Sequence, residues 1–144
     1  MRAWRLARKL HADLSGEGAR LTGGRWNSPG QPAVYMAAEA SLALLEVRVH
    51  LDLPLELLPD DYVYMEIETG DLAVEDAALP PSEDDCASIG DHWLASLRTP
   101  LLRVPSIIVP FSSNLILNPK HPDAIRAKIV NLHDCLFDTR LWRP

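Results

Sequence analysis

Apolar and polar residues alternate most regularly between Asp61 and Thr69, with a period of two. This period is typical of a strand that buries one face. It places Val63, Met65 and Ile67 on the buried face and Tyr62, Tyr64, Glu66 and Glu68 on the other. Shorter apolar runs predict further strands at Trp4–Ala7, Ala33–Ala37, Leu101–Val109 with an interruption at Pro105, Leu115–Leu117 and Ala127–Leu132.

Two longer segments have the composition and spacing of helices. Glu39–His50 is rich in leucine and alanine and runs for about three turns. Ala87–Arg98 is the second, with an apolar stripe formed by Trp93, Leu94 and Leu97. Short strands combined with two helices, without a βαβ rhythm, predict an α+β fold rather than a doubly wound sheet.

Glycine and proline mark two segments as loops. Ser15–Gly30 contains five glycines, and Leu79–Asp85 contains two prolines. Because glycine lets the backbone approach a ligand closely, the alternative for the first segment is a loop beside an active site.

The length of 144 residues and the apolar fraction of 47% predict a single domain over residues 1–144 with one core. The two cysteines, Cys86 and Cys135, have no metal-ligand spacing, so we expect neither a metal site nor a disulfide framework. No apolar run approaches the roughly 20 residues of a membrane helix. These features predict a soluble, cytoplasmic protein.

The formal net charge of −6 argues against direct nucleic-acid binding, which needs a basic face. It leaves room for a local basic pocket that binds a small anion. Nine of the 20 acidic residues lie in Glu56–Asp61 and Glu75–Asp91, whereas both ends of the chain are basic. The acidic middle fits a solvated loop, or a surface for a basic partner.

The chain has no phosphate-binding loop, dinucleotide fingerprint, HExxH or GxSxG motif. Three segments are unusual as pure structure: Gly23–Asn27 places an arginine and an aromatic residue among glycines, Val34–Ala37 holds Tyr35, and Leu44–Val47 holds Glu46. A carboxylate in an apolar helix is costly to bury unless it is paired. Glu46 is therefore a partner of Arg48 or Arg25, a residue facing solvent, or a functional group.

The string GRWNSPGQPAVYMAAEASLALLEVRVHL, residues 24–51, closely resembles the central signature of RES-domain proteins, a family named for an arginine, a glutamate and a serine. Val104-Pro105-Ser106, then Asn114, then Asn118-Pro119-Lys120-His121-Pro122 resembles the family's tail, PS…N…NPxH. Each motif is weak alone, but the ordered set covers nearly the whole chain.

This resemblance implies a fold like that of the ADP-ribosyltransferases, with mixed sheets and a few helices. It implies the toxin of a toxin–antitoxin system that depletes NAD+ by hydrolysis or phosphorolysis, with NAD+ as substrate and no prosthetic group. It implies as partner a helix-turn-helix antitoxin of the Xre type, and it allows a homodimer. Transfer of ADP-ribose onto a protein is the alternative enzymatic activity. A binding module with a vestigial pocket and a toxin that cuts RNA are less consistent with the motifs and the acidic charge.

The resemblance places the family's arginine at Arg25, its tyrosine at Tyr35, its glutamate at Glu46 and its serine at Ser106, with Ser112 and Ser113 as alternatives for the serine. Glu46 would stabilise a ribosyl cation, and Arg25 would bind phosphate or ribose oxygens or pair with Glu46. Tyr35 would stack on nicotinamide or serve as a core residue. Ser106 would contact the substrate or fix Glu46. We expect Trp26 to pack the loop. Asn114, Asn118 and His121 are expected to brace turns rather than touch the substrate, and they are candidates for supporting the residues that do.

Overall fold

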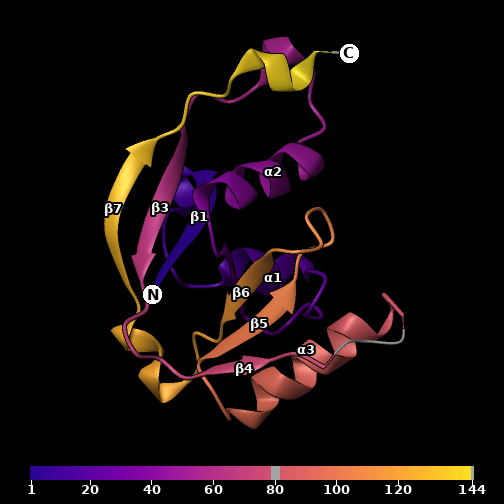
Figure 1. Ribbon diagram of the computed structural model, residues 1–144, viewed down its shortest axis with the longest axis vertical. Coiled ribbons are helices and arrows are strands. Elements are labelled where there is room, and N and C mark those ends of the chain that lie inside the picture. The colour runs from indigo at the N-terminus through magenta and orange to yellow at the C-terminus, as the bar shows by residue number, and fades with distance from the viewer. Residues whose placement is uncertain (79–81, 144) are drawn as a thin grey trace.

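The computed structural model describes residues 1–78 and 82–143, and the strands in these residues form one seven-stranded sheet in the order β4-β5-β6-β2-β1-β3-β7 (Figure 1). The strands are β1 (Arg2–Arg8), β2 (Val34–Ala37), β3 (Tyr62–Glu68), β4 (Val74–Asp76), β5 (Leu101–Pro105), β6 (Ser113–Leu117) and β7 (Lys128–Asp134). The α-helices are α1 (Glu17–Thr22), α2 (Ala40–His50) and α3 (Asp85–Ser96). Short 3-10 helices cover Lys9–His11, Leu55–Leu57, Pro122–Arg126 and Thr139–Trp142.

The sheet has two halves that meet at one point. Every residue of β1 pairs with a residue of β3, whereas β1 and β2 pair only where Trp4 lies opposite Ala37. The half β7-β3-β1 and the half β2-β6-β5-β4 therefore diverge beyond this pair. In Figure 1 the first half stands upright at the left, while β4 and β5 run across the lower part of the molecule.

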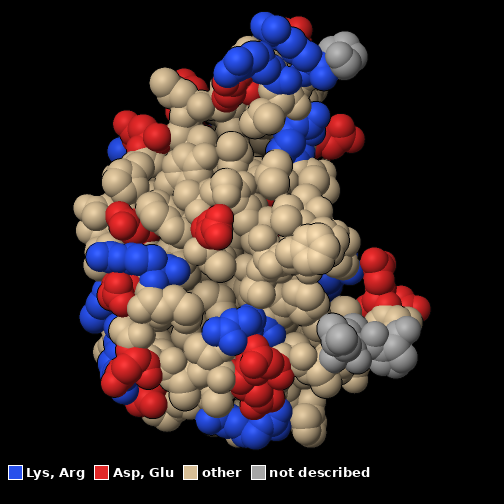
Figure 2. Space-filling model, in the orientation of Figure 1, with Lys and Arg blue, Asp and Glu red and all other residues tan. Residues whose placement is uncertain are grey.

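The helices α2 and α3 cover the same face of the sheet, one on each half. Helix α2 packs Leu42 and Ala43 against Leu6 of β1 and Ala37 of β2. Helix α3 packs Trp93 and other apolar side chains against β5 and β6. Figure 1 shows α2 above and α3 below, with the loop between β5 and β6 rising toward α2. Figure 2 shows that the middle of this side of the molecule carries few charged side chains.

The predicted α+β class is confirmed, with one unexpected local feature. Strands β4 and β5 are parallel neighbours, and α3 lies between them in the chain, so the fold contains one βαβ unit that the sequence pattern did not reveal. β4 has only three residues, which is too short for a hydrophobic period to be detected. The expected mixture of strand directions is present, but in a single sheet.

The predicted strand at residues 61–69 is confirmed by its alternating burial, and the helices predicted near residues 39–50 and 87–98 are present. Ser15–Gly30 was expected as loop throughout, but it contains α1. This helix begins directly after Gly16, whose backbone is in the left-handed conformation. β5 ends at Pro105 rather than at Val109, and the following residues form a loop. The remaining predicted strands lie where expected, with β1, β6 and β7 longer than predicted.

Two further expectations need correction or restriction. Leu97 lies outside α3 with a φ of 55° and is 45% exposed, so it does not continue the apolar stripe of that helix. Of the predicted loop Leu79–Asp85, residues 79–81 lie outside the described residues, and Asp85 begins α3. Within the described residues, no helix has both the length and the apolar character needed to span a bilayer.

Gly90 permits α3 to pack directly against the backbone at Trp26, because a Cβ at Gly90 would lie 1.7 Å from the Trp26 carbonyl oxygen. We expect Gly90→Ala to lower the free energy of unfolding by about 3 kcal/mol, since backbone on both sides must shift. Gly18→Ala is the matched control, because a Cβ there meets no atom within 4 Å. It should raise stability by roughly 0.5–1 kcal/mol. Urea denaturation of both variants tests this; equal midpoints would contradict the proposed close contact.

Candidate active site

A cleft of about 1030 Å³ opens where the two halves of the sheet part. Its walls come from β1, β2, α2, the glycine-rich loop around Arg25 and the start of the β5–β6 loop. Three of the four residues predicted for the site, Arg25, Tyr35 and Glu46, line this cleft together with Asn114. The fourth, Ser106, is buried behind Glu46. The structure thus brings all four into one neighbourhood from separate elements.

Helix α2 directs Glu46 toward β6 because Glu46 follows the buried residues Leu42 and Ala43 by one helical turn and shares their side of the helix. Asn114 stands opposite on β6. It pairs with Ala37 on one neighbouring strand and with Val104 on the other, so it lies on the sheet face that α2 covers. The packing of α2 on the sheet therefore fixes where the carboxylate meets the amide.

The Glu46 carboxylate is held by uncharged donors. Its Oε1 accepts hydrogen bonds from Asn114 Nδ2 at 2.8 Å and from Ser106 Oγ at 3.3 Å. In the described part of the chain, no cationic group lies within 4.0 Å of Glu46, and no hydrogen-bond donor reaches its Oε2. The carboxylate is thus oriented without having its charge neutralised, and one oxygen is available to a ligand.

Ser106 is the serine of the three candidates whose hydroxyl reaches Glu46 among the described residues. The same hydroxyl accepts a hydrogen bond from the Val109 amide at 3.1 Å, and the Ser106 amide donates to the Ser112 carbonyl. These bonds close the β5–β6 loop at its base. Because Ser106 is buried and does not line the cleft, the geometry favours a role in positioning Glu46 over direct contact with a substrate.

Tyr35 lines the cleft, and its hydroxyl is hydrogen-bonded within the protein. The hydroxyl accepts a hydrogen bond from the Trp26 amide at 2.9 Å and donates one to Asn27 Oδ1 at 2.7 Å. Burial raises the pKa of Tyr35 to about 12, so the phenol is neutral at physiological pH. A Cβ at Gly24 would lie 2.8 Å from this hydroxyl, which explains why a glycine stands at that position.

Asn27 organises the glycine-rich loop and was not singled out by sequence reasoning. It is buried, its Oδ1 accepts from Tyr35, and its Nδ2 faces the carbonyls of Ala19, Ser28 and Gln31. Ser28 is in turn bound through its amide and hydroxyl by the Asp91 carboxylate of α3. The loop is therefore fastened to β2, α1 and α3. The signal that the sequence offered was an asparagine within a glycine-rich segment.

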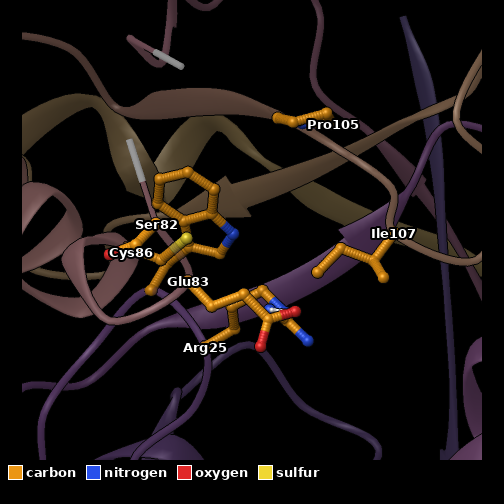
Figure 3. A pocket seen from close by; sticks show the side chains of 7 residues that line it. Arg25, Ser82, Glu83, Cys86, Pro105 and Ile107 are labelled. Atoms are coloured by element: carbon orange, nitrogen blue, oxygen red, sulfur yellow. Dashed lines mark ion pairs between the residues drawn. The ribbon is translucent and has the colours of Figure 1, made fainter. Parts of the chain in front are cut away.

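Arg25 forms an ion pair with Glu83 at 3.4 Å (Figure 3), and not with Glu46 as the sequence allowed. The two side chains are 39% and 75% exposed, respectively. An exposed pair of this kind contributes about 0–1 kcal/mol, so an anionic ligand can replace Glu83 readily. The other sequence alternative for Glu46, Arg48, donates instead to the Leu141 carbonyl and lies over the Trp142 ring.

The expected bracing roles are partly confirmed. Trp26 is buried beneath the loop, Asn118 bridges the Leu94 carbonyl and the Lys120 amide, and His121 Nδ1 accepts from the Asp123 amide. Asn114 does not brace a turn, and it takes instead the supporting role that the sequence also allowed, because its amide binds Glu46 across the fold. Its neighbour in the structure is 68 positions away in the sequence, which is why no local pattern indicated the contact.

The RES domain family model matches residues 2–139 of the chain. The chain belongs to the RES domain family. This confirms the resemblance drawn from the ordered motifs. The family assignment does not itself test the roles of Arg25, Tyr35, Glu46 and Ser106 in this RES domain. These roles stay predictions, and the shared cleft shows where each side chain would act.

Several relatives of this RES domain have names that describe toxins. The Prs ADP-ribosylating toxin of Sphingobium sp. (strain YBL2) is 41% identical over 156 residues, covering 97% of this chain and 96% of the relative. The Toxin Res of Pseudomonas putida KT2440 is 37% identical over 146 residues, covering 96% and 98%, respectively.

A third relative of this RES domain links the family to a solved structure. The NAD(+) phosphorylase MbcT of Mycobacterium tuberculosis H37Rv is 39% identical over 94 residues, or 58% of this chain and 50% of MbcT. The crystal structure of the M. tuberculosis MbcT–MbcA toxin–antitoxin complex matches with a TM-score of 0.73 at 24% identity, covering 93% of this chain and 83% of that one. This match establishes the shared fold.

The buried hydroxyl of Tyr35 predicts a pH-dependent stability. Because its folded-state pKa of about 12 exceeds the ordinary value of 10.0, the stabilisation is complete below pH 10 and is lost as the pH rises to 12. We expect Tyr35→Phe to cost about 1–3 kcal/mol at neutral pH, since the Trp26 amide and Asn27 Oδ1 lose their partner.

Between pH 10 and 12 the stability of the wild type should fall by about 2 kcal/mol more than that of Tyr35→Phe. Chemical denaturation of both proteins across this range measures the difference. Parallel pH profiles would show that the phenol is not the group whose protonation is coupled to folding.

Proposed function

We propose that this chain is a toxin that consumes NAD+ by cleaving the bond between nicotinamide and ribose. The observation that carries the proposal is the Glu46 carboxylate, which is oriented by Asn114 and Ser106 and lines the same cleft as Tyr35 and Arg25. This set supplies a negative charge, an aromatic face and a guanidinium to a dinucleotide.

The chemistry requires few protein groups. The nicotinamide ring of NAD+ is cationic, so when its bond to the ribose carbon C1 breaks, the electron pair returns to the ring nitrogen and nicotinamide leaves neutral. The ribose becomes an oxocarbenium-like cation, as in glycoside cleavage. Water or phosphate then forms the new C–O bond at the same carbon, and the attacking oxygen loses its proton to solvent. The leaving group needs no acid catalyst.

Glu46 acts on this pathway through its charge. A fixed carboxylate close to the ribose stabilises the positive charge that develops in the transition state, and it does so most strongly where water is excluded. An arginine in contact with Glu46 would cancel this effect. Holding the carboxylate with an amide and a hydroxyl, as this structure does, keeps the charge available.

The relatives support the reaction class, and their names point to two acceptors besides water. MbcT is named an NAD(+) phosphorylase, which favours phosphate as the acceptor. The relative from Sphingobium, which aligns over almost the whole chain, is named an ADP-ribosylating toxin, which favours a protein acceptor as the second candidate function. Both reactions break the same bond, so Glu46 has the same task in each.

We further propose that an antitoxin protein of the Xre helix-turn-helix type neutralises the chain in the cytoplasm by covering the cleft. The structural neighbour was solved as a toxin–antitoxin complex, which supports a protein partner. A homodimer of this chain, which the family resemblance allows, is a further part of the proposal.

Removing the charge of Glu46 while keeping its shape tests the proposed function. We expect Glu46→Gln to lower kcat for NAD+ about 10²–10³-fold, because the stabilisation of the ribosyl cation is lost. Glu39→Gln is the control, since Glu39 is an exposed carboxylate just before the same helix. Undiminished turnover by Glu46→Gln would exclude Glu46 from catalysis.

The products formed from doubly labelled NAD+, carrying labels on nicotinamide and adenine, identify the acceptor. Free ADP-ribose indicates water, ADP-ribose 1″-phosphate indicates phosphate, and adenine label retained on protein indicates transfer. Intact NAD+ after incubation with wild-type protein would refute the proposed function.

The positioning of Glu46 by Asn114 gives a separate prediction. Asn114→Ala removes one of the two donors to Oε1, and we expect kcat to fall about tenfold with little change in KM. Asn131→Ala is a matched control, because Asn131 Nδ2 makes a similar 2.9 Å bond to Glu66 on an exposed surface. Steady-state kinetics compare the two. Equal effects of both substitutions would show that the Asn114 bond has no special link to catalysis.

A further inference from the structure

One residue of the cleft has a buried oxygen without a hydrogen-bond partner. Within the described residues, two buried side-chain polar atoms lack such a partner, Asn114 Oδ1 and Trp142 Nε1. Trp142 lies beside Arg48 and does not line the cleft, whereas Asn114 lines it. A buried acceptor that receives no hydrogen bond costs free energy, and such atoms are few in native proteins. The oxygen of Asn114 therefore needs an explanation.

The Glu46 carboxylate fixes which way the Asn114 amide faces. Asn114 Nδ2 donates to Glu46 Oε1 at 2.8 Å. Turning the amide by half a rotation would lose this bond and would set Oδ1 against the carboxylate, although neither oxygen carries a hydrogen to share. Because both atoms belong to one amide, the unpaired Oδ1 stays near the carboxylate that Nδ2 holds. The amide thus has one atom in use and one atom available.

The side chains around Asn114 do not supply the missing hydrogen. Ala37 and Val104 stand opposite Asn114 on the two neighbouring strands, on the same face of the sheet, and both are apolar. The Ser106 hydroxyl already donates to Glu46 Oε1 and accepts from the Val109 amide. A donor carried by a ligand is therefore the partner that these surroundings leave open for Oδ1.

We propose that Asn114 Oδ1 holds the oxygen nucleophile that attacks the ribose carbon C1, by accepting a hydrogen bond from the hydroxyl group of that nucleophile. This inference rests on the proposed function and adds to it a residue that touches the acceptor. Glu46 is proposed to act beside C1, and Asn114 is bonded to Glu46, so an acceptor held by Oδ1 stands close to that carbon. Because Oδ1 is buried, a single hydroxyl group suits it better than a ring.

Water and hydrogen phosphate share the required chemistry, since each carries an O–H group to donate and an oxygen lone pair for the attack. As the electron pair of the bond between C1 and nicotinamide returns to the ring nitrogen, the lone pair of the acceptor forms the new C–O bond. The proton of the acceptor then passes to solvent, because an amide does not titrate near neutral pH. Asn114 therefore orients the acceptor and does not act as its base.

The ratio of the products tests this role separately from the rate. NAD+ is incubated in water with fixed amounts of phosphate and methanol, and ADP-ribose, ADP-ribose 1″-phosphate and the methyl glycoside of ADP-ribose are quantified. Methanol is the reference acceptor, because its methyl group hinders a fit at a buried atom. Asn114→Leu keeps the size of the side chain and removes Oδ1. We expect the main wild-type product to fall about threefold to tenfold relative to the methyl glycoside, as for one lost hydrogen bond. Whether ADP-ribose or its phosphate falls identifies the acceptor that Oδ1 holds.

Two matched variants separate the oxygen of Asn114 from its amide nitrogen. Asn114→Asp keeps an acceptor oxygen and loses the donor to Glu46. Ser106→Ala removes the other donor to Glu46 Oε1 and leaves Asn114 in place. Both variants should lower kcat and keep the wild-type product ratio. Asn114→Ala carries the same expectation as Asn114→Leu and replaces it if the leucine variant does not fold.

An unchanged product ratio in Asn114→Leu or Asn114→Ala, with NAD+ still consumed, would overturn the inference and leave the proposed function intact. An equal shift of the ratio in Ser106→Ala would also overturn it, because the ratio would then follow the placement of Glu46. A higher KM with an unchanged ratio would assign Oδ1 to the substrate instead of the acceptor. Intact NAD+ after incubation with the wild type would refute the proposed function, and this inference with it.

Discussion

Strands β1 and β2 share a single residue pair, Trp4 with Ala37, and the cleft exists because of this limited pairing. A longer ladder between the two strands would close the sheet and fill the space that Arg25, Tyr35 and Glu46 now line. The complete pairing of β1 with β3, and of β2 with β6, keeps each half rigid while the junction opens. Binding surface is thus created by leaving backbone pairing incomplete at one place in an otherwise continuous sheet.

Around this opening, the polar groups form two separate systems. Tyr35, Asn27 and the Trp26 amide hold the glycine-rich loop on one wall. Asn114 and Ser106 hold Glu46 on the other. No hydrogen bond between these two sets was found among the residues that the structure describes. The side chains of each wall are therefore positioned by their own hydrogen bonds. A ligand that spans the cleft would contact both sets of side chains.

Much of the fold could be predicted from local patterns. The alternation around Met65 and the leucine-rich segment containing Glu46 gave the correct element types, because burial on one face leaves a clear period. Short elements were missed: β4 has three residues, and α1 lies in a glycine-rich segment where propensity favours loops. The one parallel pair depends on a crossover through α3 and has no local signal.

The candidate site was predictable through the ordered motifs and not through periodicity. Those motifs located Glu46 and Tyr35, but they could not show that Asn114 binds Glu46 or that Asn27 binds Tyr35, because these contacts form only when distant strands meet. The partner of Arg25 could not be predicted either, since Glu83 lies in an acidic stretch that carries no motif.

The contact between Arg25 and Glu83 has a consequence for how tightly the cleft retains what it binds. An anion that reaches Arg25 exchanges one ion pair for another, so the net gain at this position is only the difference between the two partners. When the ligand departs, Glu83 can pair with the Arg25 guanidinium again. Glu83 thus competes with any anion at this end of the cleft, and because the exposed pair contributes only about 0–1 kcal/mol, the competition would weaken binding there by no more than roughly fivefold.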